Sequence, residues 1–297
     1  MVFERILVPI DGSMVSGKAL EFAVERAKLH NSKITIAFAV NRLAVEAATA
    51  GPYTYVDPAP MLEALEAEAE AVLGSAESAL RAGGVESKRA RLDGPAAQAI
   101  LAFARQTNPD VIVMGTHGRR GFERLAVGST AEDVVRASAV PVFVVPQRAA
   151  ATACRPFQRL LVPVDGSPAS DDALAFACDV AQRERARLTL CTVAEAVGMD
   201  WDDIDRDLFL EAEIEERARP LLERSRLRAS SLGIEVDTDL REGSAVAEIV
   251  ASAERAGADA IVIGTHGRAG IPRFILGSVA EGVLRSSSIP VCTIRHR

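Results

Sequence analysis

The run Gly-Thr-His-Gly-Arg occurs twice in this chain, at residues 115–119 and again at residues 264–268. In both places nine residues separate its second glycine from a Gly-Ser pair, which is Gly128-Ser129 in the first copy and Gly277-Ser278 in the second. Earlier in each half, Leu-Val-Pro-Ile-Asp-Gly-Ser at 7–13 is matched by Leu-Val-Pro-Val-Asp-Gly-Ser at 161–167. The chain is therefore a tandem duplication. What it keeps twice is glycine, serine and aspartate at the ends of apolar runs, where α/β folds bind their ligands.

Apolar runs and helical stretches alternate in each half. The pattern of the first half predicts strands at Arg5–Ile10, Lys33–Val40, Val85–Leu92, Asp110–Gly115 and Pro141–Pro146. It predicts helices at Ser13–His30, Pro60–Ala82, Pro95–Gln106 and Ser129–Ser138, and a loop over Asn41–Pro58. The second half repeats this order, with strands near Arg159–Val164, Arg187–Val193, Glu235–Arg241, Asp259–Gly264 and Pro290–Ile294. Strands separated by helices imply right-handed crossovers and a parallel sheet, so we expect two α/β domains, 1–147 and 157–297, with a linker at 148–156.

Composition excludes several classes of protein. The 297 residues are 48% hydrophobic but only 4% aromatic, which is typical of parallel sheets covered by helices. A net charge of −7 without an evident basic face argues against general nucleic-acid binding. Apolar runs such as Ala139–Val145 are too short to cross a bilayer, and no signal peptide is expected, because the first residues lead straight into a strand. The four cysteines have no metal-ligand spacing, so we expect reduced thiols in the cytoplasm.

The repeated residues fall where a ligand crevice is expected. In doubly wound sheets, the first and fourth strands flank the point where strand order reverses, which would bring Asp11 close to Gly115, and Asp165 close to Gly264. Glycines allow positive φ and close approach of a ligand, and turn N–H groups can converge on an anion. The helix that follows each Gly-Ser pair adds free N–H groups, and Arg119 adds a full charge. The assembly suits a polyphosphate, and the aspartate suits a ribose hydroxyl, an exocyclic amine or a hydrated Mg²⁺.

Structural explanations compete for some of these residues. The serine of each Gly-Ser pair fits a capping box, and Ser13 and Ser167 fit helix N-caps, so capping and ligand contact both stay open for the serines. The strand-end aspartates are also common turn formers before glycine, although their position favours a ligand. His117 and His266 have no acid nearby in sequence, which favours a role in shaping the loop over catalysis. The repeated glycine spacing, which capping does not explain, favours ligand binding.

The spacing G-x2-G-x9-G-[ST] is the ATP-binding signature of the universal stress protein family, and it occurs in full twice. Neither a Walker loop nor a dinucleotide fingerprint is present. The chain resembles a tandem universal stress protein over essentially its whole length. The resemblance implies two Rossmann-like domains of the adenine nucleotide alpha hydrolase type, each a five-stranded parallel sheet of order 3-2-1-4-5 flanked by helices. It also implies self-association through the fifth strands, Pro141–Pro146 and Pro290–Ile294, and we expect a homodimer of tandem chains.

The resemblance further implies ATP in each crevice, with adenine and ribose near the first and second strand ends and phosphates on the glycine loop. The ATP-binding residues that we expect in the first domain are Pro9, Ile10, Asp11, Ser13, Val40, Met114, Gly115, His117, Gly118, Arg119, Gly128, Ser129 and Thr130. Those of the second domain are Pro163, Val164, Asp165, Ser167, Val193, Ile263, Gly264, His266, Gly267, Arg268, Gly277, Ser278 and Val279. The acidic stretch 200–207 is either a solvated surface or a lid that would weaken ATP binding in the second domain.

Three functions follow from this reading. The first is an ATP-binding regulator or sensor of stress, with ATP alone or with Mg²⁺, with slow or no hydrolysis and with no catalytic residues, because no residue is a committed general base. The second is an ATPase or phosphoryl or nucleotidyl transferase in which His117 or Asp11 takes part in chemistry. The third is a chaperone-like scaffold with a structural nucleotide. We expect no nucleic-acid or membrane partner, and the sequence names neither a protein partner nor the inducing stress.

Overall fold

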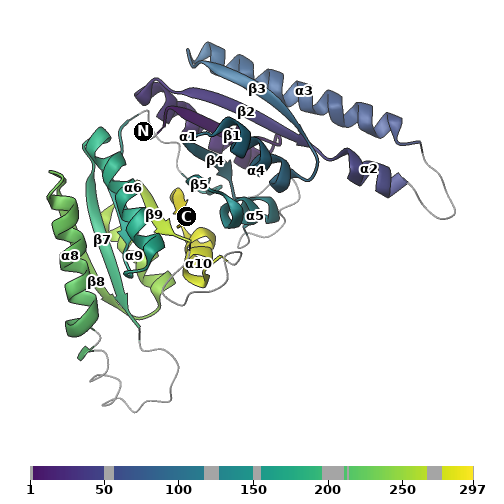
Figure 1. Ribbon diagram of the computed structural model, residues 1–297. Coiled ribbons are helices and arrows are strands. Elements are labelled where there is room, and N and C mark those ends of the chain that lie inside the picture. Colours follow the sequence, from purple (N-terminus) through teal and green to yellow (C-terminus); the bar gives the residue numbers. More distant parts are fainter. Residues whose placement is uncertain are drawn as a thin grey trace. The chain divides into compact units, whose positions relative to one another are not determined.

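The structure, a computed structural model, describes residues 3–49, 57–116, 127–149, 155–195, 211–212, 214–265 and 276–296. The chain divides into two compact units, Met1–Arg155 and Pro156–Arg297, and each unit alternates strands with helices (Figure 1). None of the helices in the described ranges combines the length and the apolar character needed to cross a membrane.

The first unit is a parallel sheet with the strand order β3-β2-β1-β4-β5. Its strands are β1 (Arg5–Pro9), β2 (Lys33–Val40), β3 (Ser87–Asp93), β4 (Val111–Gly115) and β5 (Val142–Val145). Its helices are α1 (Met14–His30), α2 (Arg42–Thr49), α3 (Ala59–Ala82), α4 (Ala96–Thr107) and α5 (Ser129–Ala137). This order confirms the expected Rossmann-like winding.

The second unit repeats the same winding, with the strand order β8-β7-β6-β9-β10. Its strands are β6 (Arg159–Pro163), β7 (Arg187–Ala194), β8 (Val236–Glu242), β9 (Ala260–Gly264) and β10 (Val291–Ile294). Its helical segments are α6 (Pro168–Glu184), a π-helical turn η1 (Ile214–Ala218), α8 (Arg219–Ser230), α9 (Ala245–Ala256) and α10 (Ser278–Ser286). The duplication read from the sequence is therefore also a duplication of fold.

The core of each unit lies along its central strands. Ile6 of β1 pairs with Ile34 of β2 on one side and with Val111 of β4 on the other, and all three side chains are buried. Right-handed crossovers place α1 and α3 on one face of this sheet and α4 and α5 on the other, and α4 packs directly on α5. The strand order reverses between the neighbouring strands β1 and β4. The connections from these two strands therefore leave in opposite directions, and a crevice opens between their carboxyl ends.

Helix α2 corrects the sequence prediction. We expected a loop over residues 41–58, whereas Arg42–Thr49 is helical. The Oδ1 atom of Asn41 accepts a hydrogen bond from the backbone N–H of Ala44 at 3.1 Å, which caps the start of the helix. A helix of eight residues spans only about two turns, which is too few for its period to be told from a loop in the sequence.

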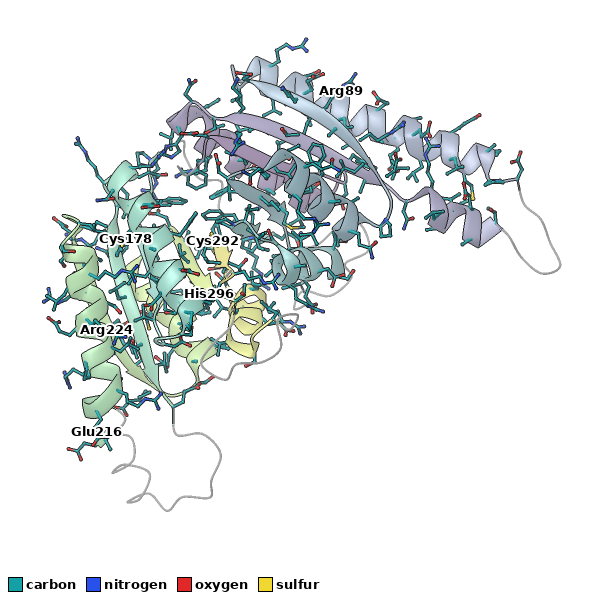
Figure 2. The ribbon with its side chains drawn as sticks, in the orientation of Figure 1. Arg89, Cys178, Glu216, Arg224, Cys292 and His296 are labelled. Carbon is teal, nitrogen blue, oxygen red and sulfur yellow. The ribbon has the colours of Figure 1, made fainter. Side chains whose placement is uncertain are left out.

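The second unit carries buried thiols. Cys178 on α6, Cys191 on β7 and Cys292 on β10 are free cysteines, and Figure 2 labels the first and the last of them. Burial raises the pKa of Cys178 to about 11 and that of Cys191 to about 11, and it raises the pKa of Cys292 well above its ordinary value. These thiols are therefore protonated at neutral pH and unreactive, as expected for small core side chains.

Candidate functional site

Asp11 lies just beyond β1, in a loop that its own neighbours hold in place. Its Oδ1 atom accepts the backbone N–H of Ser13 at 3.0 Å, and its own N–H donates to the Oγ atom of Ser16 at 3.4 Å. The Oγ atom of Ser13 accepts the N–H of Ser16 at 3.2 Å and so caps α1, as the sequence predicted. Gly12 between them has φ 79°, a left-handed conformation that favours glycine.

The second unit builds the same loop from the same residue types. The Oδ1 atom of Asp165 accepts the N–H of Ser167 at 2.9 Å, and the N–H of Asp165 donates to the Oγ atom of Ser170 at 3.2 Å. The Oγ atom of Ser167 accepts the N–H of Ser170 at 3.2 Å. The pattern Asp-Gly-Ser-x-x-Ser therefore fixes the orientation of each aspartate. Its last serine was missed by the sequence reading, although its repetition at residues 16 and 170 was visible.

The strand-end glycines have a packing role that the sequence reading did not assign. A Cβ atom on Gly115 would lie 2.7 Å from Cγ1 of Val15 and 2.9 Å from the backbone of Val15. A Cβ atom on Gly264 would lie 2.6 Å from the backbone carbon of Ala169. Neither glycine has a positive φ, so the requirement is space and not backbone conformation. Gly115 therefore lets the first turn of α1 approach the end of β4, and Gly264 lets the first turn of α6 approach the end of β9.

Helix α5 begins without a side-chain cap. Its N-cap is Gly128, whose N–H donates to the carbonyl of Thr116 at 2.6 Å, and Ser129 is the first helical residue. In the second unit, α10 likewise begins after Gly277, whose N–H donates to the carbonyl of Thr265 at 2.8 Å. The capping-box interpretation of the Gly-Ser pairs is therefore wrong, because it needs serine one position earlier. The first amides of α5 remain available to an anion.

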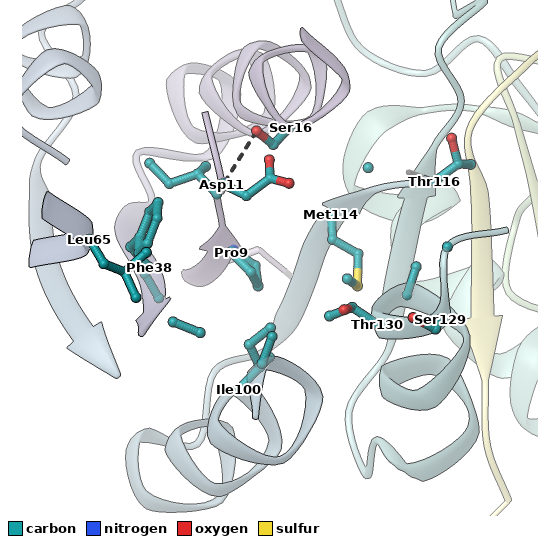
Figure 3. A pocket seen from close by; sticks show the side chains of 17 residues that line it. Pro9, Asp11, Ser16, Phe38, Leu65, Ile100, Met114, Thr116, Ser129 and Thr130 are labelled. Atoms are coloured by element: carbon teal, nitrogen blue, oxygen red, sulfur yellow. Dashed lines mark hydrogen bonds between the residues drawn. The ribbon is translucent and has the colours of Figure 1, made fainter. Parts of the chain in front are cut away.

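A cavity of about 520 Å³ in the first unit joins these features. One end is apolar, with Pro9, Phe38, Leu65 and Ile100, and the other is polar, with Thr116, Ser129 and Thr130 (Figure 3). Asp11 lies between these ends, on the α1 side. The residues expected from the sequence that line the cavity are Pro9, Ile10, Asp11, Met114, Gly115, Gly128, Ser129 and Thr130. Those that the sequence reading missed are Ser16, Ala37, Phe38, Ala39, Leu65, Ala96, Ile100, Thr116 and Ala131.

Two of the expected residues that the structure describes in the first unit do not line the cavity. Ser13 is used as the cap of α1, and Val40 is fully buried with its carbonyl accepting the N–H of Gly94 at 2.9 Å. The matching bond in the second unit runs from Gly243 to Ala194, so Val40 corresponds to Ala194 and not to Val193. Val193 instead corresponds to Ala39, which does line the cavity. The sequence reading therefore misaligned the second strands by one residue.

In the second unit, the described members of the expected set occupy the matching places. Pro163, Val164 and Asp165 follow or end β6, Ile263 and Gly264 end β9, and Ser278 and Val279 begin α10. The three residues after the strand-end Gly-Thr in each unit (His117, Gly118, Arg119; His266, Gly267, Arg268) and the acidic stretch 200–207 lie outside the described residues. Within the described parts of the chain, no group of His, Cys, Asp and Glu side chains could hold a metal ion.

Comparison with known proteins agrees with this geometry. The model of the universal stress protein family matches residues 3–146 and 156–295. A universal stress protein of Mycolicibacterium smegmatis is 29% identical over 299 residues, covering 98% of this chain and 97% of that protein. One from Mycobacterium tuberculosis is 26% identical over 305 residues, with 98% and 97% covered. The crystal structure of a universal stress protein from Archaeoglobus fulgidus has a TM-score of 0.71 at 24% identity, covering 98% of this chain and 96% of that one.

Proposed function

Because the chain belongs to the universal stress protein family, we propose that it is an ATP-binding regulator or sensor of stress with slow or no hydrolysis. The observation that carries the proposal is the cavity of about 520 Å³ at the carboxyl ends of β1 and β4. It combines an apolar end with the uncapped N-terminus of a helix, and ligand pockets of this size commonly enclose molecules as large as a nucleotide.

The two ends of the cavity suit the two ends of ATP. A planar adenine fits between Pro9, Phe38 and Ile100, where burial of apolar surface stabilises it. The hydroxyls of Ser129 and Thr130 and the first amides of α5 suit the phosphates, because a helix N-terminus attracts anions. The Oδ2 atom of Asp11 suits a hydrogen bond donated by a ribose hydroxyl. A Mg²⁺ ion would be held mainly by phosphate oxygens, since Asp11 is the one carboxylate among the described lining residues.

The lining supports binding better than catalysis. At the polar end, the described side chains are hydroxyls, which donate hydrogen bonds to phosphate but do not serve as bases near neutral pH. Asp11 is the one titratable side chain among the described lining residues, and its Oδ1 atom is already occupied by the N–H of Ser13. A general base needs to lie within hydrogen-bond reach of the attacking water. We therefore propose a nucleotide-dependent regulator and expect turnover to be slow.

Titration calorimetry on the full-length chain tests the proposal. We expect ATP to bind better than GTP. We also expect Thr130→Val to weaken ATP binding about fivefold, because one hydrogen bond is worth about 1 kcal/mol. Ser78→Ala is the control, since its hydroxyl lies on the exposed side of α3 and donates to the carbonyl of Gly74. No binding of ATP at millimolar concentration would contradict the proposal, and rapid release of phosphate from Mg-ATP would favour the enzyme reading.

The proposal also covers assembly and location. The fifth strands Val142–Val145 and Val291–Ile294 are apolar and end the strand order of their own units, and the backbone groups of an end strand can pair with another strand. We propose that these strands mediate self-association into a homodimer of tandem chains. The free buried thiols support a reducing compartment such as the cytoplasm.

A further inference from the structure

The two units can be matched residue by residue at the apolar end of the crevice. Ile10 donates its N–H to the carbonyl of Ala37, and Val164 donates to the carbonyl of Cys191, both at 2.8 Å. These bonds align β2 with β7. One residue after each strand, Asn41 of the first unit therefore corresponds to Glu195 of the second.

The side chains at these matched positions go to different places. The Oδ1 atom of Asn41 accepts the N–H of Ala44 and so belongs to the start of α2. The Oε1 atom of Glu195 instead accepts the N–H of Ala245 at 2.5 Å, which places its carboxylate on the first turn of α9. The counterpart of Ala245 is Ala96, the first residue of α4, whose N-cap Pro95 offers no side-chain hydrogen bond.

Ala96 lines the cavity of the first unit, together with Ile100 one turn further along α4. The carboxylate of Glu195 consequently lies where the apolar end of the crevice would be in the second unit. The position of Phe38 is taken there by Thr192, whose Oγ1 atom donates to the carbonyl of Val164 at 2.9 Å. The second unit therefore replaces an aromatic surface by a smaller, internally bonded side chain and adds a negative charge beside it.

We propose that Glu195 makes the crevice of the second unit the weaker ATP site, because it places a carboxylate at the end of the crevice that binds adenine in the first unit and adds a negative charge to a site for an anionic ligand. The proposal rests on the proposed nucleotide binding and names a difference between its two sites. Repulsion between this carboxylate and phosphates at the other end of the crevice, over about 10 Å at the dielectric of a protein surface, lowers affinity about fivefold to tenfold. The first unit is the site that fills first, and the second fills when the nucleotide concentration is high.

Photolabelling with 8-azido-ATP reads each site separately in the full-length chain. Labelled peptides from the two units are quantified by mass spectrometry over a range of probe concentrations, with excess ATP as competitor. In the wild-type chain, half-maximal labelling of the first unit is expected at about fivefold to tenfold lower probe concentration than that of the second. Glu195→Asn, which installs the residue of the first unit, should lower the half-maximal concentration of the second unit about fivefold and leave the first unchanged.

Two further variants complete the test. Asn41→Glu should weaken labelling of the first unit, and Glu235→Gln should change neither site. Glu235 is exposed at the opposite end of the sheet, where it pairs with Arg187. Equal half-maximal concentrations in the wild-type chain, or no effect of Glu195→Asn beyond that of Glu235→Gln, would overturn the inference while leaving nucleotide binding intact. Absence of competable labelling in both units would overturn the proposed function, and the inference with it.

Discussion

Adding one methyl group at Gly264 is expected to destabilise the second unit even when no nucleotide is present. The added Cβ atom would lie 2.6 Å from the backbone carbon and 2.8 Å from the oxygen of Ala169, and 2.8 Å from the nitrogen of Ser170. All three atoms belong to the backbone of the first turn of α6, so no side chain can rotate away to make room. Helix α6 has to move off the sheet instead.

The size of the effect follows from two opposing contributions. Non-bonded atoms prefer about 3.5–4.0 Å, so the helix has to retreat by about 1 Å. Overpacking of this kind costs about 1–3 kcal/mol, and the rigid backbone contact puts Gly264 toward the upper part of that range. Replacing glycine by alanine also stabilises by about 0.4–1 kcal/mol through the unfolded chain. We expect a net loss of about 2 kcal/mol, which for a unit of this size lowers Tm by about 4–8 °C.

Differential scanning calorimetry of the nucleotide-free chain measures this change. Gly74→Ala on α3 is the matched control, because nothing lies within 4 Å of the place that its Cβ atom would take and alanine favours a helix interior by about 1 kcal/mol. Gly264→Ala should lower the melting temperature of the second unit, whereas Gly74→Ala should raise that of the first. If Gly264→Ala left the transition unchanged or raised it, the close approach of α6 would not explain this glycine, and a ligand role would be left as its explanation.

Three other outcomes are expected. Gly118→Val or Gly267→Val should each lower the ATP stoichiometry by one site without changing the circular dichroism spectrum, and an unchanged stoichiometry would show that these glycines are not needed for nucleotide binding. Because burial raises the pKa of Cys191 from 9.0 to about 11, its folded form binds the proton more tightly, and the free energy of unfolding should fall as pH rises between these values. Cys191→Ala should remove that part of the pH dependence. Urea titrations at a series of pH values measure it, and the same fall of unfolding free energy with pH in the variant as in the wild type would contradict the prediction. Val144→Lys on β5 should disrupt self-association in analytical ultracentrifugation, and an unaltered sedimentation profile would mean that another surface joins the chains.

Much of the fold was predictable because local patterns and tertiary structure agree. The buried run ending at Gly115 and the capping serine Ser13 are local features, and the structure has both where the sequence places them. Helix α2 was not recovered, since two turns are too few for a helical period to stand out. The N-cap at Gly128 was not recovered, since glycine and serine both occur at N-caps and the sequence does not choose between two adjacent positions.

The apolar half of the cavity was not predictable in the same way. Leu65 and Ile100 lie on helices far from the glycine signature, and they reach the cavity only because α3 and α4 pack on opposite faces of the same sheet. No spacing within the sequence encodes that convergence. Phe38 was passed over for Val40, because the run from Ile36 to Val40 is apolar at every position, so its sequence does not show which side chains face the cavity.

Mass spectrometry of the bound nucleotide shows whether adenine nucleotide occupies this chain. The full-length protein is incubated with equal millimolar concentrations of ATP and GTP, separated from free nucleotide and denatured, and the released nucleotides are quantified per chain. We expect ATP to be released, in preference to GTP and largely unhydrolysed. Release of no nucleotide, or of GTP in place of ATP, would contradict this expectation.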